Sequence, residues 1–194
     1  MTIDESVGSF LRVSALYRGR VSADLETFRP THIVSLLDPA LDQAKIPSFG
    51  AVTTMQRKFP DLDTPGAALL SSQMFGEIVE FVSGWAAARQ RGEDARLLVH
   101  CHMGASRSTA TALISLAVLR GHGNEGRAFD DLMRITNKPW PNYNLVALAD
   151  DLLDRKGLLI AELLRYRERY PRRLDAYMRL NLRRGQALPD WPST

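Results

Sequence analysis

The chain has 194 residues, a mass of 21.7 kDa and 45% hydrophobic residues, which suits one substantial core rather than two domains. Its single cysteine excludes an internal disulfide, and its acidic and polar start lacks the pattern of a secretion signal. No run approaches the ~20 apolar residues of a bilayer span. We therefore expect a cytoplasmic protein. The net charge of +3 is uneven, because residues 155–184 alone carry ten Lys and Arg against three Asp and Glu.

The first third of the chain alternates apolar runs with a helical pattern. Residues 10–17 and 31–37 predict short buried strands, and the segment between them predicts a helix with Ser22 as its cap. Residues 51–59 predict a third strand, and PDLDTPG, residues 60–66, predicts a loop with two carboxylates. Strands and helices that alternate in this way are typical of a sheet covered by helices.

The cysteine lies at a predicted strand-to-helix turn. From Ala67 to Arg91 apolar residues recur at intervals of three and four, which predicts a long amphipathic helix that stops at Gly92. Residues 96–100, RLLVH, predict a short strand that ends at Cys101, and residues 107–121 predict the next helix.

Four more helical segments follow, the first capped by Asn124, with breaks at residues 137–142, Gly157 and Pro171. We therefore expect an α/β fold with a central, mostly parallel sheet of four to five strands, flanked by helices and followed by extra C-terminal helices.

The segment VHCHMGASRST, residues 99–109, has the chemistry of an anion-binding nucleophile. The reactive form of cysteine is the thiolate, and an ordinary thiol is mostly protonated at neutral pH unless a positive potential acts on it. A helix N-terminus supplies that potential, and Gly104 lets the loop curl so that its N–H groups point inward. Arg107 can bind two oxygens of a phosphate with its planar guanidinium. Ser108, or alternatively Thr109, can donate a hydrogen bond to the thiolate.

The pattern HC-x5-RS, which begins at His100, resembles the signature of the cysteine-dependent protein tyrosine phosphatase superfamily, and HCHMGASRS is similar to its dual-specificity branch. Downstream, KPWPNYNLVALADDLL resembles the turn and helix that follow in that branch, with Asn144 and Leu145 where glycine and phenylalanine are common. Some bacterial tyrosine-phosphatase-like proteins also match the DLDTP and PN portions. The resemblance covers residues 8–157.

The resemblance implies a role for each matching residue. Cys101 would attack phosphorus, Arg107 would bind the phosphate, and Ser108 would assist the sulfur as a leaving group. His100 and Asn142 would support the loop. The loop residues implied to surround the phosphate are His102, Met103, Gly104, Ala105 and Ser106.

A carboxylic acid must also protonate the leaving oxygen and then activate water. The acidic residues within the helix over 67–91 and in the turn at 93–94 are predicted too far from the cysteine. Asp61 and Asp63 lie in the proline-bounded loop, and the D-x-x-x-P form of Asp61 to Pro65 resembles the acid loop of several family members. We assign Asp61 as the general acid and keep Asp63 as the alternative.

These features predict a phosphatase that acts through a cysteinyl-phosphate intermediate, without a cofactor or a metal; His102 is assigned to the rim of the loop. Positions 102–106 contain no lysine, whereas phosphoinositide-selective relatives tend to carry lysines there. We therefore expect a phosphoprotein substrate, with phosphotyrosine ahead of phosphoserine, phosphothreonine or a small phosphoester. The alternatives are a catalytically weak phosphate-binding module and another cysteine enzyme such as a sulfurtransferase.

Residues 158–194 form an Arg-rich helical extension to a catalytic domain at residues 1–157. The apolar stripe of LLIAELLRYRERY predicts packing on that domain or, in a homodimer, on a second copy of the chain. Alternatively, the basic surface steers anionic substrates, nucleic acid or an acidic lipid surface toward the site. We favour the packing role, and we expect neither a nucleic-acid partner nor a membrane span.

Overall fold

The computed structural model describes residues 6–66 and 70–183. The strands are β1 (Leu11–Ala15), β2 (His32–Leu37), β3 (Thr53–Lys58) and β4 (Leu97–Cys101). The α-helices are α1 (Arg20–Phe28), α2 (Ser72–Gln90), α3 (Arg107–Arg120), α4 (Glu125–Ile135), α5 (Tyr143–Leu152), α6 (Leu158–Arg169) and α7 (Arg172–Arg183). Short 3-10 helices lie at Val7–Ser9, Tyr17–Gly19 and Gln43–Lys45.

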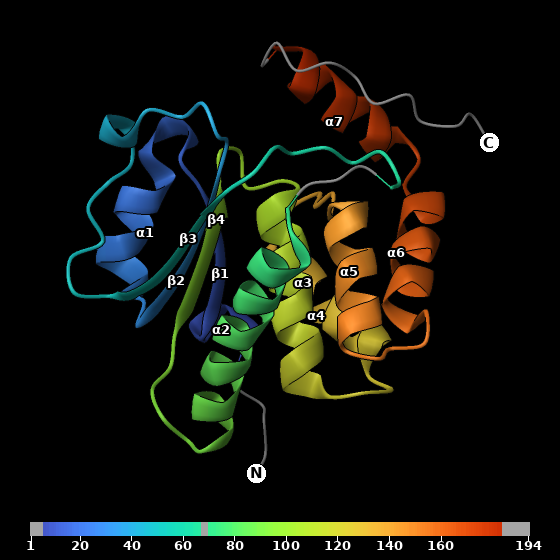
Figure 1. Ribbon diagram of the computed structural model, residues 1–194, viewed down its shortest axis with the longest axis horizontal. Helices are drawn as coiled ribbons and strands as arrows, with labels where there is room; N and C mark the ends of the chain where they lie inside the picture. The colour runs from blue at the N-terminus through green and yellow to red at the C-terminus, as the bar shows by residue number, and fades with distance from the viewer. Residues whose placement is uncertain (1–5, 67–69, 184–194) are drawn as a thin grey trace.

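Within the described residues the sheet has four strands, all parallel, in the order β1-β4-β2-β3 (Figure 1). Helix α1 covers one face, and α2 and α3 cover the other, with α4, α5 and α6 layered beyond α3. The predicted α/β fold is confirmed. The carboxyl ends of all four strands meet at one edge of the sheet, where parallel α/β folds form their sites.

Strand β4 is buried on both faces, which explains the unbroken apolar run of Leu97, Leu98 and Val99. Its side chains alternate, because successive residues of a strand point to opposite faces. Val99 and Cys101 join the core on the α3 side, whereas Leu98 packs beneath α1. The sulfur of Cys101 therefore lies on the face toward the helix that follows it in sequence.

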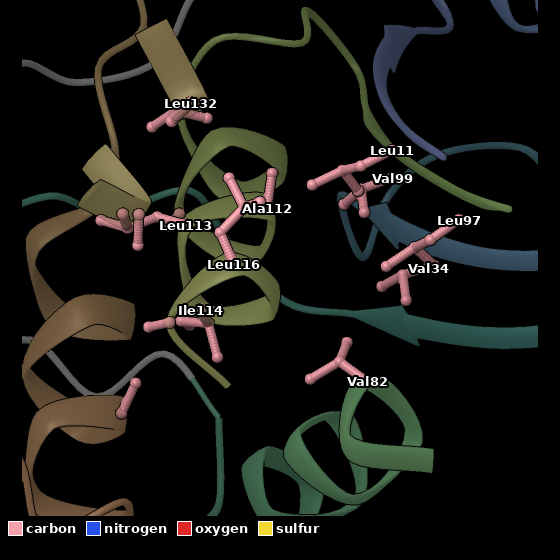
Figure 2. Close-up of a cluster of buried hydrophobic side chains, with 14 of the residues drawn as sticks. Leu11, Val34, Val82, Leu97, Val99, Ala112, Leu113, Ile114, Leu116 and Leu132 are labelled. Atoms are coloured by element: carbon pink, nitrogen blue, oxygen red, sulfur yellow. The ribbon is translucent and has the colours of Figure 1, made fainter. Parts of the chain in front are cut away.

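The main core lies between the sheet and α3 (Figure 2). Every residue of α3 from 107 to 117 is buried, because sheet and helices surround it, so this helix shows no amphipathic pattern. The side chains labelled in the cluster are Leu11, Val34, Val82, Leu97, Val99, Ala112, Leu113, Ile114, Leu116 and Leu132. This packing fixes the position of the N-terminus of α3.

The starts of α1, α2 and α4 differ in detail from the predicted ones. Ser22 is not a cap, because the 3-10 turn before α1 continues directly into the helix through Gly19, the N-cap, with φ +66°. The predicted start of α2 at Ala67 lies outside the described residues, and the helix begins at Ser72 after a Ser71 cap. Asn124 does precede α4 as predicted, but its side chain donates to the Arg120 carbonyl instead of capping.

Helix α6 is part of the main core of the chain. Leu159 and Leu163 are fully buried there. The Asp150 carboxylate accepts hydrogen bonds from the N–H groups of Gly157, Leu159 and Ile160, so it caps the start of α6. The apolar stripe thus packs on the body of the same chain, whereas a homodimer and a domain boundary at 157 stay predictions. Residues 184–194 of the predicted extension lie outside the described residues.

Helix α7 lies at the same end of the molecule as the carboxyl ends of the strands (Figure 1). No helix in the described part of the chain combines the length and the apolar character needed to cross a bilayer.

Candidate active site

The loop of residues 102–106 joins β4 to α3 and is held from two sides. The N–H groups of Leu16 and Tyr17 donate to the carbonyls of Cys101 and His102, at 3.0 and 2.9 Å. On the other side, the Trp140 N–H donates to the Ala105 carbonyl at 2.8 Å. Because backbone hydrogen bonds clamp both ends, the loop has a defined shape that does not depend on its own side chains.

Cys101 lies at the floor of this loop and is 1% exposed. The Gly104 N–H donates to Cys101 Sγ at 3.2 Å, and Ser108 Oγ lies 3.2 Å from the same sulfur. Thr109 Oγ1 instead donates to the carbonyls of Ala105 and Ser106. The structure therefore places Ser108, and not Thr109, beside the sulfur, at the N-terminal turn of α3 where the helix dipole favours an anion.

Arg107 is fully buried, and its guanidinium is oriented by three groups. Its Nη1 donates to the Phe59 carbonyl at 2.6 Å, while Nη2 lies 3.1 Å from Asp38 Oδ1 and Nε lies 3.7 Å from Asp61 Oδ2. Burial alone would lower the pKa of Arg107, but the charges of Asp61, Cys101 and Asp38 outweigh it and raise the pKa.

The Nε and Nη2 atoms of Arg107 face carboxylates, and each forms an ion pair, Nη2 with Asp38 and Nε with Asp61. These two nitrogens form the edge of a guanidinium that binds two oxygens of one phosphate. Since the third nitrogen is fixed at Phe59, this edge has a defined orientation, and a bound phosphate would compete with Asp38 and Asp61 for its donors.

The two candidate acids in the loop after β3 have different surroundings. Asp61 faces the loop of residues 102–106, called here the cysteine loop. Its Oδ1 accepts hydrogen bonds from Ser106 Oγ at 2.6 Å and from Asn142 Nδ2 at 3.2 Å. Asp63 faces away, toward Trp140, Tyr143 and Arg167. Of the two carboxylates, only that of Asp61 is brought to the cysteine loop.

Asn142 lies at the site in a different way from the one expected. Besides Asp61, its amide donates to the Leu62 carbonyl at 3.0 Å, and its Oδ1 accepts from the Leu145 N–H as the cap of α5. Asn142 therefore braces the loop of Asp61, which in turn contacts Ser106.

The two histidines beside Cys101 lie in different environments. His100 is fully buried on the α1 side of the sheet, with its ring centroid 5.6 Å from that of Phe49. Burial lowers its pKa to about 4, and a contact with the Cys101 backbone opposes that shift only in part. His100 is therefore neutral at pH 7 and adds no charge to the site. His102 and Met103 are partly exposed in the loop.

Three further residues that the sequence did not single out lie at the site. Asp38 directly follows β2, so its place at the carboxyl edge of the sheet was a usable signal. Tyr177 of α7 is 4% exposed, its hydroxyl lies 3.4 Å from Ser106 Oγ, and its ring stacks on Trp140. Neither Tyr177 nor Arg167 has a local sequence signal, because the contacts of Tyr177 with Ser106 and of Arg167 with Asp63 join residues 71 and 104 positions apart. Among the described residues, no group of three His, Cys, Asp or Glu side chains is placed to bind a metal.

Comparison with solved structures shows which fold this is. Human DUSP28 is 18% identical and matches 76% of this chain and 94% of its own, with a TM-score of 0.55. The phosphatase domain of Yvh1 from Chaetomium thermophilum is 20% identical and matches 77% and 93%, with a TM-score of 0.53. A human tyrosine phosphatase-like serine/threonine/tyrosine-interacting protein is 20% identical and matches 75% and 92%, with a TM-score of 0.52.

No protein-family model and no curated protein matches the sequence. The structural likeness establishes the fold: the chain has the architecture of the dual-specificity and tyrosine phosphatases, as HC-x5-RS predicted.

Proposed function

We propose that the chain is a cysteine-dependent phosphatase that hydrolyses phosphomonoesters. One observation carries this proposal: the buried sulfur of Cys101 meets an N–H group of its own loop and the Ser108 hydroxyl, with the buried Arg107 at the start of the next helix. These are the groups that stabilise a thiolate and bind a phosphate. The phosphatase-like fold supports the same conclusion.

In the first step the Cys101 thiolate attacks phosphorus, so that an S–P bond forms as the P–O bond to the leaving group breaks. The loop N–H groups and the Nε and Nη2 edge of Arg107 stabilise the charge on the phosphoryl oxygens. Asp61, as a carboxylic acid, donates its proton to the leaving oxygen.

In the second step Asp61, now a carboxylate, takes a proton from water. The hydroxide that forms attacks phosphorus, the S–P bond breaks, and inorganic phosphate leaves. The Ser108 hydroxyl, 3.2 Å from the sulfur, stabilises the departing thiolate. The enzyme thus returns to its starting state without a cofactor. A thiolate nucleophile of this kind suits the reducing cytoplasm.

An aryl phosphate assay across pH tests the assignment. Cys101→Ser is expected to abolish turnover. Asp61→Asn is expected to remove the alkaline limb of the kcat/KM profile and to lower kcat/KM by roughly 10²- to 10⁴-fold, as the loss of a general acid does. If Asp63→Asn removes that limb and Asp61→Asn does not, the acid is misassigned.

We propose a phosphoprotein substrate, because the loop at 102–106 has no lysine to attract a more highly charged phosphoinositide. Among phosphoproteins we place phosphotyrosine ahead of phosphoserine and phosphothreonine. Matched peptides that differ only in the phosphorylated residue test this preference. A higher kcat/KM for the phosphoserine peptide would overturn it.

A catalytically weak phosphate-binding module is the second candidate. The hydrogen bonds from Ser106 and Asn142 to Asp61 favour it, since they tie the carboxylate to protein donors. Turnover near zero, together with a rise in Tm when inorganic phosphate is added, would support this reading. A sulfurtransferase needs no acid on the upstream loop, so cyanide-dependent turnover of thiosulfate that Asp61→Asn leaves unchanged would identify one.

A further inference from the structure

We propose that Arg167 of α6 is a positioning residue that holds the loop of the general acid in place. This inference rests on the proposed function, because it gives Asp61 the role of that acid. It assigns part of the Arg-rich C-terminal segment to the active site.

The contact that joins α6 to this loop is made through Asp63. The Asp63 side chain is 1% exposed, and its two carboxylate oxygens both lie 2.9 Å from Arg167 Nη2. Trp140 Nε1 and the Tyr143 N–H donate to the same carboxylate at 2.8 and 2.6 Å. With all of its bonding capacity used inside the protein, Asp63 serves as an anchor and not as an acid.

Arg167 is itself held rigidly. Its side chain is 7% exposed, its Nη2 also donates to the Pro141 carbonyl, and its guanidinium lies 4.3 Å from the Trp140 ring centroid. Arg165 on the same helix offers the contrast, because it is 65% exposed and its ion pair within the described residues is with Glu162, one turn away. Two arginines of one helix therefore have different roles, and one can serve as the control for the other.

Asp63 and Asp61 lie two residues apart on one short backbone segment. Leu62 between them is 41% exposed, so the two carboxylates point inward while the side chain between them points to solvent. The Leu62 carbonyl accepts hydrogen bonds from the side chains of Asn142 and Asn144. Because Asp61 and Asp63 share this short backbone segment, we expect a displacement of Asp63 to strain the bonds that hold Asp61 against the cysteine loop.

Removal of the Arg167 charge leaves the Asp63 carboxylate buried without a counter-charge. Such a group either takes up a proton or moves toward water, and either change loosens the loop. In the first step, a misplaced acid slows the departure of a leaving group that needs a proton and hardly affects one that departs as an anion. General destabilisation would slow both kinds of reaction equally.

The experiment compares phenyl phosphate, which has a poor leaving group, with 4-nitrophenyl phosphate, which has a good one. For Arg167→Met we expect kcat/KM on phenyl phosphate, which reports the first step alone, to fall by roughly tenfold or more, and kcat/KM on 4-nitrophenyl phosphate to fall much less. Arg167→Lys should restore part of the loss, because it keeps the charge, and it also serves if Arg167→Met does not fold. Arg165→Met should leave both rates unchanged.

Hydrogen exchange of the peptide over residues 59–66 gives a readout that needs no activity. Exchange there should be faster in Arg167→Met than in the wild type and in Arg165→Met. Equal losses on both substrates, or unchanged exchange in this peptide, overturns the proposal. If the wild type shows no Cys101-dependent turnover, the proposed function is refuted. The exchange result alone then decides whether Arg167 holds the loop.

Discussion

Gly104 occupies the most constrained backbone position of the cysteine loop, and its replacement by alanine tests the geometry on which the site depends. Its φ is +70°, and a Cβ atom added there would lie 2.8 Å from the Ser14 carbonyl oxygen and 3.3 Å from Ala15 Cβ. Both obstacles belong to β1, which the core holds in place, so neither can move aside. The Gly104 N–H that donates to the Cys101 sulfur would shift with the backbone.

Gly50 provides the matched control for this substitution. Its φ is +59°, but nothing lies within 4 Å of an added Cβ. The left-handed backbone costs an alanine about 1–2 kcal/mol at either position. Overlap with the β1 backbone adds about 1–3 kcal/mol at Gly104 only. In a chain of this size the difference between the variants corresponds to a Tm that is about 2–12 °C lower for Gly104→Ala.

Thermal and urea unfolding of both variants, with and without inorganic phosphate, measures this difference. Phosphate should raise the Tm of the wild type and of Gly50→Ala and have little effect on Gly104→Ala, because its loop N–H groups no longer converge. Equal destabilisation of the two variants, or equal protection by phosphate, would refute the reasoning about the loop.

Two other predictions concern charges at the site. Burial lowers the pKa of His100 from 6.5 to about 4. Between these pH values the unfolded chain binds a proton that the folded chain does not, so the stability of the folded chain falls as the pH drops. Urea unfolding should show a loss of about 2 kcal/mol from pH 7 to pH 5 that His100→Asn lacks; the same pH dependence in both proteins would contradict this. Asp38→Asn removes an anion 3.1 Å from Arg107 Nη2, so inorganic phosphate should inhibit several-fold more tightly. Weaker inhibition would show that Asp38 instead holds Arg107 ready for phosphate.

Much of the fold could be predicted because its signals are local. Strands β1, β2 and β4 and the helix after Arg107 follow from apolar runs and turn residues close together in sequence. Helix starts were less predictable, as Ser22 shows, because a turn that continues into the helix removes the need for a side-chain cap.

The sequence by itself determined the centre of the site, since Cys101, Gly104, Arg107 and Ser108 lie within eight residues and a strand followed by a helix leaves their geometry little freedom. It could not decide whether Asp61 or Asp63 is the general acid, because both are aspartates in the same short loop. Only the tertiary structure separates them, because the donors that orient each carboxylate come from distant segments: Ser106 for one, and Arg167, 104 residues away, for the other. Local spacing encodes turns and helix faces, whereas such pairings exist only after the helices have packed on the sheet.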